Sequence, residues 1–283
     1  MILDFHTHLF PKDIRENRSA FFEGEPAFEL LYRPEKSPLA GAADILADMD
    51  QDQVDASVVF GFPWNSGELF RRHNDCILDR AAKHPGRLFG FGCFDVLHPD
   101  APAEAERCLS AGAAGLGELA LYKSGINEES LKRLDPVMAV AREYGNAPVL
   151  IHVNEPVGHM YPGKTPVTLG EVWNLILRYP DNRLVLAHWG GGVFFYHLLK
   201  REAKAALKNV WVDTAASPYL YDPRIWGVAA GILGPGRILF GTDYPLLKAR
   251  RYWKELEGTE LAPTAREAIL GENAKALLAG RGD

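Results

Sequence analysis

The chain has 283 residues, 47% of them hydrophobic, a size and composition that suit one large α/β barrel or two small domains. A net charge of −6 argues against a surface that grips a nucleic-acid backbone. The opening MILDFHTH lacks the features of a signal peptide, and no apolar run reaches the ~20 residues that cross a bilayer. The three cysteines are scattered, which favours free thiols in the cytosol over disulfides. We therefore expect a cytoplasmic protein that binds neither nucleic acid nor membrane.

Short apolar runs alternate with helical stretches along the chain. We expect strands at 2–6, 56–62, 88–94, 113–119, 148–153, 183–188, 210–215 and 238–243. Helical periodicity falls between them at 41–53, 65–84, 100–111, 128–145, 168–179 and 192–207. Near-continuous apolar strands are typical of parallel strands that helices cover on the outside. The pattern predicts an α/β fold, a (β/α)8 TIM barrel that forms a single domain over 1–283. An open doubly wound sheet is the alternative, but no glycine-rich phosphate loop follows the first strand.

A long insertion, residues 9–40, separates the first strand from the first long helix. It carries Arg15, Arg18, Tyr32 and Arg33. An insertion of this length usually caps a pocket or has another function. A disordered or dimer-contacting loop is the alternative.

Polar side chains gather where the apolar strands end, and in a barrel these ends face one mouth, where active sites lie. Residues two apart on a strand share a face, so the first two histidines can point at one ion. Imidazole nitrogens and carboxylate oxygens suit Zn²⁺ or a similar divalent metal. Burying each group unpaired would cost several kcal/mol, so a shared cation is the economical explanation, with a metal-free hydrogen-bond cluster as the alternative. The residues at the strand ends are His6, His8, Glu118, His152, His188, Asp213 and Asp243.

Several motifs together resemble the amidohydrolase superfamily, and within it the amidohydrolase-related branch that includes aminocarboxymuconate-semialdehyde and resorcylate decarboxylases. The resemblance spans nearly the whole chain. It rests on DFHTHLFP (4–11), LIHVNEP (150–156), LAHWGGG (186–192), VWVDTAA (210–216), ILFGTDYP (238–245) and LGENAKALL (270–278).

The resemblance implies that His6, His8, His152 and Asp243 bind the metal and that His188 lies beside a metal-bound water or the substrate. Many superfamily members bridge two metals with a carboxylated lysine on the fourth strand, where this chain has Glu118. Glu118 either bridges to a second metal held with His152 and His188, or orients a histidine from outside the metal shell. Lys123 lies beyond the strand end and is a poorer bridge.

The favoured function is a metal-dependent hydrolase that acts on an amide, lactone or ester of a small carboxylated or cyclic metabolite. One zinc ion would lower the pKa of a bound water towards ~7. Asp243 would move the proton, and His188 would stabilise the developing oxyanion. The same site suits a metal-dependent decarboxylase or hydratase of an unsaturated or aromatic acid, which is the main alternative. A non-catalytic binding protein is a third possibility, disfavoured because Asp243 and the His6–His8 pair are intact.

The segment after the fifth strand, NEPVGHMYPGKTP, supplies candidates for substrate recognition. They are Glu155, His159, Tyr161 and Lys164, joined by Trp64 from after the second strand. Lys164 or an arginine of residues 9–40 would pair with a substrate carboxylate. The alternative is a turn cluster whose charges are solvated. The relatives often pair, so we also expect a homodimer.

Overall fold

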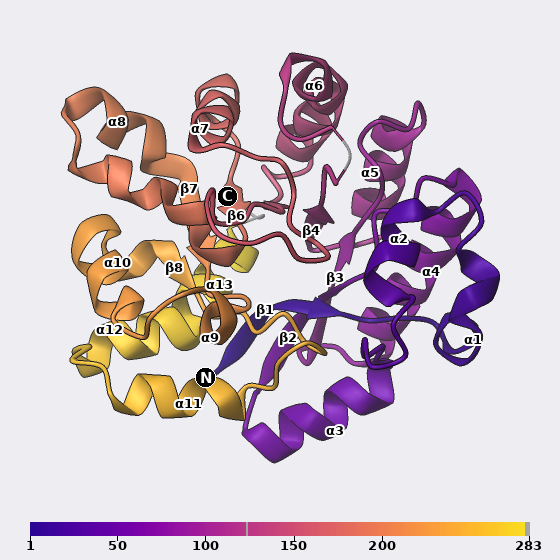
Figure 1. Cartoon of the computed structure of the whole chain (residues 1–283), viewed down its shortest axis with the longest axis horizontal. Helices are drawn as coiled ribbons and strands as arrows, with labels where there is room; N and C mark the ends of the chain where they lie inside the picture. The colour runs from indigo at the N-terminus through magenta and orange to yellow at the C-terminus, as the bar shows by residue number, and fades with distance from the viewer. Residues whose placement is uncertain (123, 281–283) are drawn as a thin grey trace.

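Eight parallel strands form one sheet in chain order that closes into a barrel (Figure 1). The computed structural model describes residues 1–122 and 124–280. Backbone hydrogen bonds from Phe5 to Phe240 and from His8 to Tyr244, both 2.7 Å, join the first strand to the segment after the last. The TIM barrel predicted from the sequence is therefore confirmed. The strands are β1 Leu3–His8, β2 Ala56–Phe60, β3 Leu88–Gly92, β4 Gly115–Leu119, β5 Val149–Ile151, β6 Leu184–Leu186, β7 Val210–Asp213 and β8 Ile238–Leu239.

Helices surround the strands (Figure 1). Three of the helices begin with a capping side chain that accepts a backbone N–H: Ser66 caps α4 (Gly67–Lys83), Asn127 caps α6 (Glu128–Glu143) and Thr168 caps α7 (Leu169–Arg178). The longer helices are α3 Ala42–Asp52, α4 Gly67–Lys83, α5 Ala101–Ser110, α6 Glu128–Glu143, α7 Leu169–Arg178, α10 Ile225–Leu233 and α11 Arg250–Glu257. The shorter ones are α1 Lys12–Glu16, α2 Pro26–Tyr32, α8 Arg201–Ala206, α9 Ser217–Leu220, α12 Pro263–Glu267 and α13 Asn273–Ala279. Single turns occur at Arg18–Phe21, Leu207–Asn209, Pro235–Arg237 and Ala268–Glu272.

The core has two layers, one inside the barrel and one between barrel and helices. The inner layer includes Phe5, Phe60, Phe91, Leu150 and Leu239, all fully buried. Burying an aromatic or leucine side chain contributes about 1.5–3 kcal/mol. This packed layer fills the barrel's interior, with the polar residues at the strand ends above it.

One expected helix, 192–207, is broken. The backbone from Trp189 to Gly192 has positive φ values of 58° to 92°, and His188–Leu198 is a run of tight turns. Leu199 and Lys200 are extended, so regular helix is confined to α8. The apolar spacing after the glycines suggested a helix, but Gly190–Gly192 favour left-handed turns that a helix does not tolerate.

The insertion after β1 is ordered, so the alternative of a disordered loop is wrong. It folds into α1, a single turn and α2. The Arg18 guanidinium donates to the backbone carbonyls of Tyr32 and Ser37, at 3.3 and 2.8 Å, which ties the ends of the insertion together. Phe28 is fully buried and anchors α2 on the barrel.

Three further expectations concern single features. All three cysteines are free thiols, and Cys93 and Cys108 are buried. Across the described residues, no helix is both long enough and apolar enough to span a bilayer. Lys123, the poorer bridge candidate, lies outside the described residues.

Candidate metal centre

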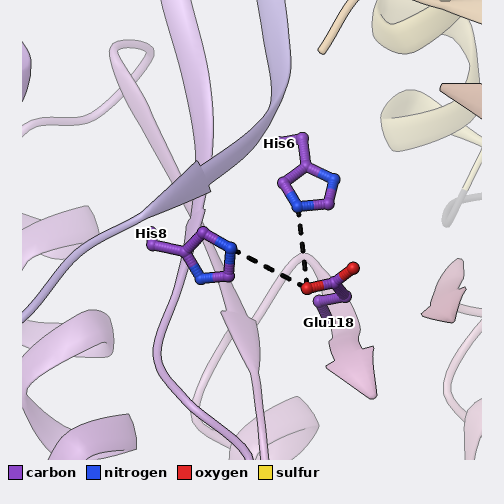
Figure 2. Close-up of side chains that lie close together, drawn as sticks. All are labelled: His6, His8 and Glu118. Carbon is purple, nitrogen blue, oxygen red and sulfur yellow. Dashed lines mark ion pairs between the residues drawn. The ribbon is translucent and has the colours of Figure 1, made fainter. Parts of the chain in front are cut away.

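His6 and His8 point from the end of β1 towards one carboxylate. Figure 2 shows Glu118, from the end of β4, facing both rings. Its Oε2 lies 3.6 Å from His6 Nε2 and 3.8 Å from His8 Nε2. The β1–β2 register shifts between Asp4 and Thr7, which lets Phe5 and His6 both face the barrel interior.

Asp243 joins this group from the segment after β8. Its Oδ1 lies 3.5 Å from His6 Nε2 and 3.2 Å from His8 Nε2. The backbone at Asp243 has φ of 64°, a conformation that costs free energy in a residue with a side chain. Asp4 holds the preceding residue, Thr242, through its hydroxyl at 2.5 Å and its amide at 3.0 Å. Asp4 thus stabilises the turn that aims Asp243 at the two histidines.

Three histidines are oriented by hydrogen-bond acceptors that face their Nδ1 atom, the ring nitrogen that points away from Glu118 and Asp243. His6 Nδ1 lies 2.8 Å from Asp213 Oδ2, His188 Nδ1 lies 3.0 Å from the Ala215 carbonyl, and His8 Nδ1 lies 3.4 Å from the Gly61 carbonyl. A carbonyl or an ionised carboxylate only accepts, so Nδ1 carries the hydrogen in each ring. When these rings are neutral, each Nε2 keeps a lone pair for a metal, as in metal sites where an acceptor on Nδ1 fixes the tautomer.

The donor atoms fit a divalent metal ion. His6 Nε2 is buried and has no hydrogen-bond partner among the described residues, although an unpartnered buried nitrogen is costly. Ligands about 2.1 Å from an ion in tetrahedral geometry lie roughly 3.4 Å apart. The distances of 3.2–3.8 Å between the histidine nitrogens and the oxygens of Glu118 and Asp243 match this spacing. The barrel mouth therefore holds the donors of a divalent-metal site.

The second oxygen of Glu118 faces a different pair of histidines. Oε1 lies 2.8 Å from His152 Nδ1 and 3.7 Å from His188 Nε2, and the three residues form a second group of potential ligands. Gly117 allows Glu118 this position, since its φ is 126° and a side chain there would collide with the Leu150 carbonyl. Glu118 consequently lies between two sets of histidines, with one oxygen towards each.

His152 differs from the other three histidines because both of its nitrogens are hydrogen-bonded. Nδ1 faces Glu118, and Nε2 donates to the Gly163 carbonyl at 3.0 Å. Burial alone would lower the pKa of His152, but the Glu118 charge outweighs it and raises the pKa. His152 must give up one of these contacts before it can bind a metal.

The electrostatics of the cluster favour a cation. Burial would raise the pKa of Asp243, but the hydrogen bond from His8 and the charge of His6 outweigh burial and lower it. In Glu118, the charges of His6 and His152 likewise outweigh burial and hold its pKa well below the usual value. Both carboxylates are therefore ionised and supply negative charge to an ion at the mouth.

The predicted substrate residues lie in three places. Glu155, Tyr161 and Lys164 contact one another, since Glu155 accepts the Tyr161 hydroxyl and the Lys164 ammonium, each at 2.7 Å. His159 is exposed on the same segment. Trp64 is fully buried, and its indole N–H donates to His73 at 2.9 Å, so the structure does not bring it to the metal donors.

Sequence reasoning missed two kinds of residue. Asp4 lies in the DFHTHLFP motif and shares β1 with His6, but the motif alone does not indicate its contact with Thr242. Tyr32 and Tyr122 also lie beside the site. Their positions depend on how residues 9–40 and the segment after β4 fold over the barrel, which no local pattern indicates.

Comparisons with known proteins identify the family of the chain and several relatives. The amidohydrolase family model matches residues 3–279. The γ-resorcylate decarboxylases of a Polaromonas species and of Rhodococcus jostii are each 23% identical to the chain. The alignment covers 75% of this chain for the Polaromonas protein and 74% for the Rhodococcus protein, and 76% of each relative.

Solved structures share the fold. A Polaromonas dihydroxybenzoic acid decarboxylase with bound manganese and 2-nitroresorcinol has a TM-score of 0.69 at 19% identity, covering 98% of this chain and 96% of the other. A Novosphingobium aromaticivorans 5-carboxyvanillate decarboxylase with bound manganese has a TM-score of 0.74 at 15% identity, covering 99% and 97%.

These names contradict the favoured functional prediction. The curated relatives are decarboxylases and not hydrolases, as are several of the structural neighbours. Hydrolysis of an amide, lactone or ester was the wrong first choice. The residues that move protons and bind metal serve either reaction, so they did not distinguish the two.

Proposed function

Because the chain belongs to the amidohydrolase family, we propose that it is a metal-dependent decarboxylase that removes the carboxylate of a small aromatic acid as CO₂. The observation that carries the proposal is the convergence of His6, His8, Glu118 and Asp243 at the barrel mouth. The decarboxylase relatives support this reaction over the others that such a site performs.

We propose manganese as the ion, in place of the zinc expected from the sequence, because two similar decarboxylase structures hold manganese. His6, His8, Asp243 and Oε2 of Glu118 would hold it. A second, weaker position is formed by Oε1 of Glu118 with His152 and His188, and it is weaker because His152 must first release a hydrogen bond. When bound, the ion supplies a Lewis acid that binds the substrate's acidic oxygens and stabilises the charge that develops on them.

Asp243 transfers the proton that the reaction needs, and His188 orients the substrate by accepting a hydrogen bond. The bond between the ring and the carboxyl carbon breaks, CO₂ leaves, and the electron pair stays on the ring carbon, which needs one proton. Asp243 is ionised in the resting site, so it first takes a proton from the substrate's acidic groups or from solvent, then delivers it to the ring carbon and returns to the ionised state. Its side chain is 16% exposed, against 4% for Glu118, so it is the more accessible of the two carboxylates at the mouth. His188 is neutral because burial lowers its pKa, and its Nε2 accepts a hydrogen bond from a substrate hydroxyl.

The test is metal-dependent consumption of aromatic acids. The protein is stripped with a chelator, reloaded with Mn²⁺, and incubated with 2,6-dihydroxybenzoate or 5-carboxyvanillate. We expect resorcinol or vanillate to accumulate with the reloaded protein and not with the stripped one, as followed by chromatography. Activity that is equal with and without metal, or hydrolysis of lactones and esters in place of decarboxylation, would refute the proposal.

Three expectations from the sequence stay predictions. They are a single domain over 1–283, a homodimer, and a cytoplasmic location.

A further inference from the structure

Two tyrosines from distant parts of the chain meet beside the metal donors. Tyr32 ends α2 in the insertion after β1, and Tyr122 follows β4. The Phe62 ring contacts both, with ring centroids 6.0 Å from Tyr32 and 6.1 Å from Tyr122. The Tyr122 ring also lies 5.4 Å from the ring of His152. The two phenols therefore form one wall next to the site.

Their hydroxyl groups are not used within the protein. Among residues 1–122 and 124–280, neither hydroxyl has a hydrogen-bond partner. Two other buried tyrosines are satisfied internally, since Tyr179 donates to the Leu131 carbonyl at 2.7 Å and Tyr252 to the Thr242 carbonyl at 2.9 Å, whereas the buried Tyr221 hydroxyl has no partner among the described residues. Neither the Tyr32 nor the Tyr122 hydroxyl is among the described side-chain atoms that are both fully buried and unpartnered, so both are open to a ligand at the mouth that accepts their hydrogen.

Both phenols are in the field of the site's carboxylates. Burial raises the pKa of Tyr32, and the charges of Asp243 and Glu118 raise it further. Burial and the Glu118 charge likewise raise the pKa of Tyr122. Each hydroxyl therefore keeps its hydrogen and acts as a donor.

The cations expected to bind a substrate carboxylate are already engaged. The Lys164 ammonium donates to Glu155 at 2.7 Å and to the Val157 carbonyl at 2.6 Å. The Arg18 guanidinium binds backbone carbonyls of its own insertion, as described above. The two other arginines of the insertion, Arg15 and Arg33, pair with Asp44 and Glu29. Lys164 and the three arginines of the insertion therefore each have a partner within the protein.

We infer that the hydroxyls of Tyr32 and Tyr122 donate hydrogen bonds to the acidic oxygens of the aromatic acid at the metal centre, in place of a cationic side chain. The inference rests on the proposed function for the class of ligand. The rings are packed against Phe62 and, for Tyr32, against Phe10 at 5.2 Å and Phe28 at 4.8 Å. Such packing fixes the donors before the ligand arrives, which lowers the entropy lost on binding.

The test is calorimetric titration of the manganese-loaded protein with 2-nitroresorcinol, an inhibitor bound in a related decarboxylase. The variants are Tyr32→Phe, Tyr122→Phe and the double variant. Each single variant removes one hydrogen bond to a charged acceptor, so we expect about ten- to a hundredfold weaker binding, and a larger loss in the double variant. The matched control is Tyr144→Phe, whose hydroxyl contacts Ser110 at 2.7 Å outside the metal donors and should leave binding unchanged.

Thermal melts of each variant check that the fold is retained, since phenylalanine keeps the packed ring. A double variant that binds 2-nitroresorcinol within twofold of the wild type would overturn the inference, as would a wild type that does not bind it. Weakened binding in a protein that releases no CO₂ from any aromatic acid supports the inference and refutes the proposed reaction. Decarboxylation with an unchanged KM in the double variant supports the reaction and refutes the inference.

Discussion

Replacing Asp243 with asparagine should lower kcat by on the order of a thousandfold and leave the fold intact. Asparagine keeps the size of the side chain but cannot take up a proton and pass it to the ring carbon. It also replaces an anionic metal ligand, 3.2 Å from His8 Nε2, with a neutral one. The measurement is steady-state decarboxylation at saturating Mn²⁺, so that weaker metal binding does not conceal the effect on the chemical step.

The control for the Asp243 variant is Asp222→Asn, which removes an exposed carboxylate that pairs with Arg224. We expect wild-type rates and a wild-type melting temperature from this control. If Asp243→Asn retained more than a tenth of wild-type kcat, Asp243 would not be the proton donor.

Replacing Asp213 with asparagine should weaken manganese binding by about ten- to a hundredfold. Asp213 is fully buried, and its Oδ2 accepts from His6 Nδ1 at 2.8 Å. Its Oδ1 accepts from the backbone amides of His188 and Ala215, at 2.9 and 3.0 Å. Asparagine leaves the shape but removes the charge that fixes the His6 tautomer. It also turns one acceptor into a donor, which costs about 1–3 kcal/mol of unfolding free energy in a buried site.

Manganese titration and chemical denaturation measure these two effects separately. The control is Asp79→Asn, in which an exposed carboxylate that pairs with Lys83 is neutralised. Unchanged manganese affinity in Asp213→Asn would mean that His6 does not need this carboxylate to bind the ion.

The barrel followed from the sequence because its strands carry a strong local signal. The run ASVVF of β2 is buried at all five positions, as expected of a strand covered on both faces. The stretch 192–207 misled because apolar spacing alone does not register the left-handed turns of Gly190–Gly192. The left-handed conformation is already present at Trp189, before the stretch 192–207, so the apolar spacing within that stretch gives no sign of it.

The meeting of these histidines and carboxylates was predictable because barrel topology places the ends of parallel strands together. Topology did not predict the hydrogen bond of His152 to the Gly163 carbonyl, because Gly163 lies in a loop whose conformation the sequence pattern does not indicate. Trp64 was expected to line the mouth, but the Phe28 ring covers it at 4.4 Å, and Phe28 belongs to the insertion after β1. Loop packing over the barrel therefore set the limit on predicting substrate contacts.

The sequence did not distinguish hydrolysis from decarboxylation, and the reason is chemical. A metal ion, a carboxylate that moves protons and a neutral histidine serve water activation as well as carbanion protonation. The choice depends on which ligand the mouth holds, and this is why the two tyrosine hydroxyls are informative. They favour an anion with oxygens fixed on a rigid ring.

The central claim is that His6, His8, Glu118 and Asp243 hold one divalent ion at the barrel mouth. Anomalous scattering from a crystal of the manganese-loaded protein, recorded on both sides of the manganese edge, tests it most directly. We expect the strongest peak within bonding distance of His6 Nε2, His8 Nε2 and Asp243 Oδ1. A well-ordered crystal grown in manganese with no peak there, or with its strongest peak elsewhere, would contradict the claim.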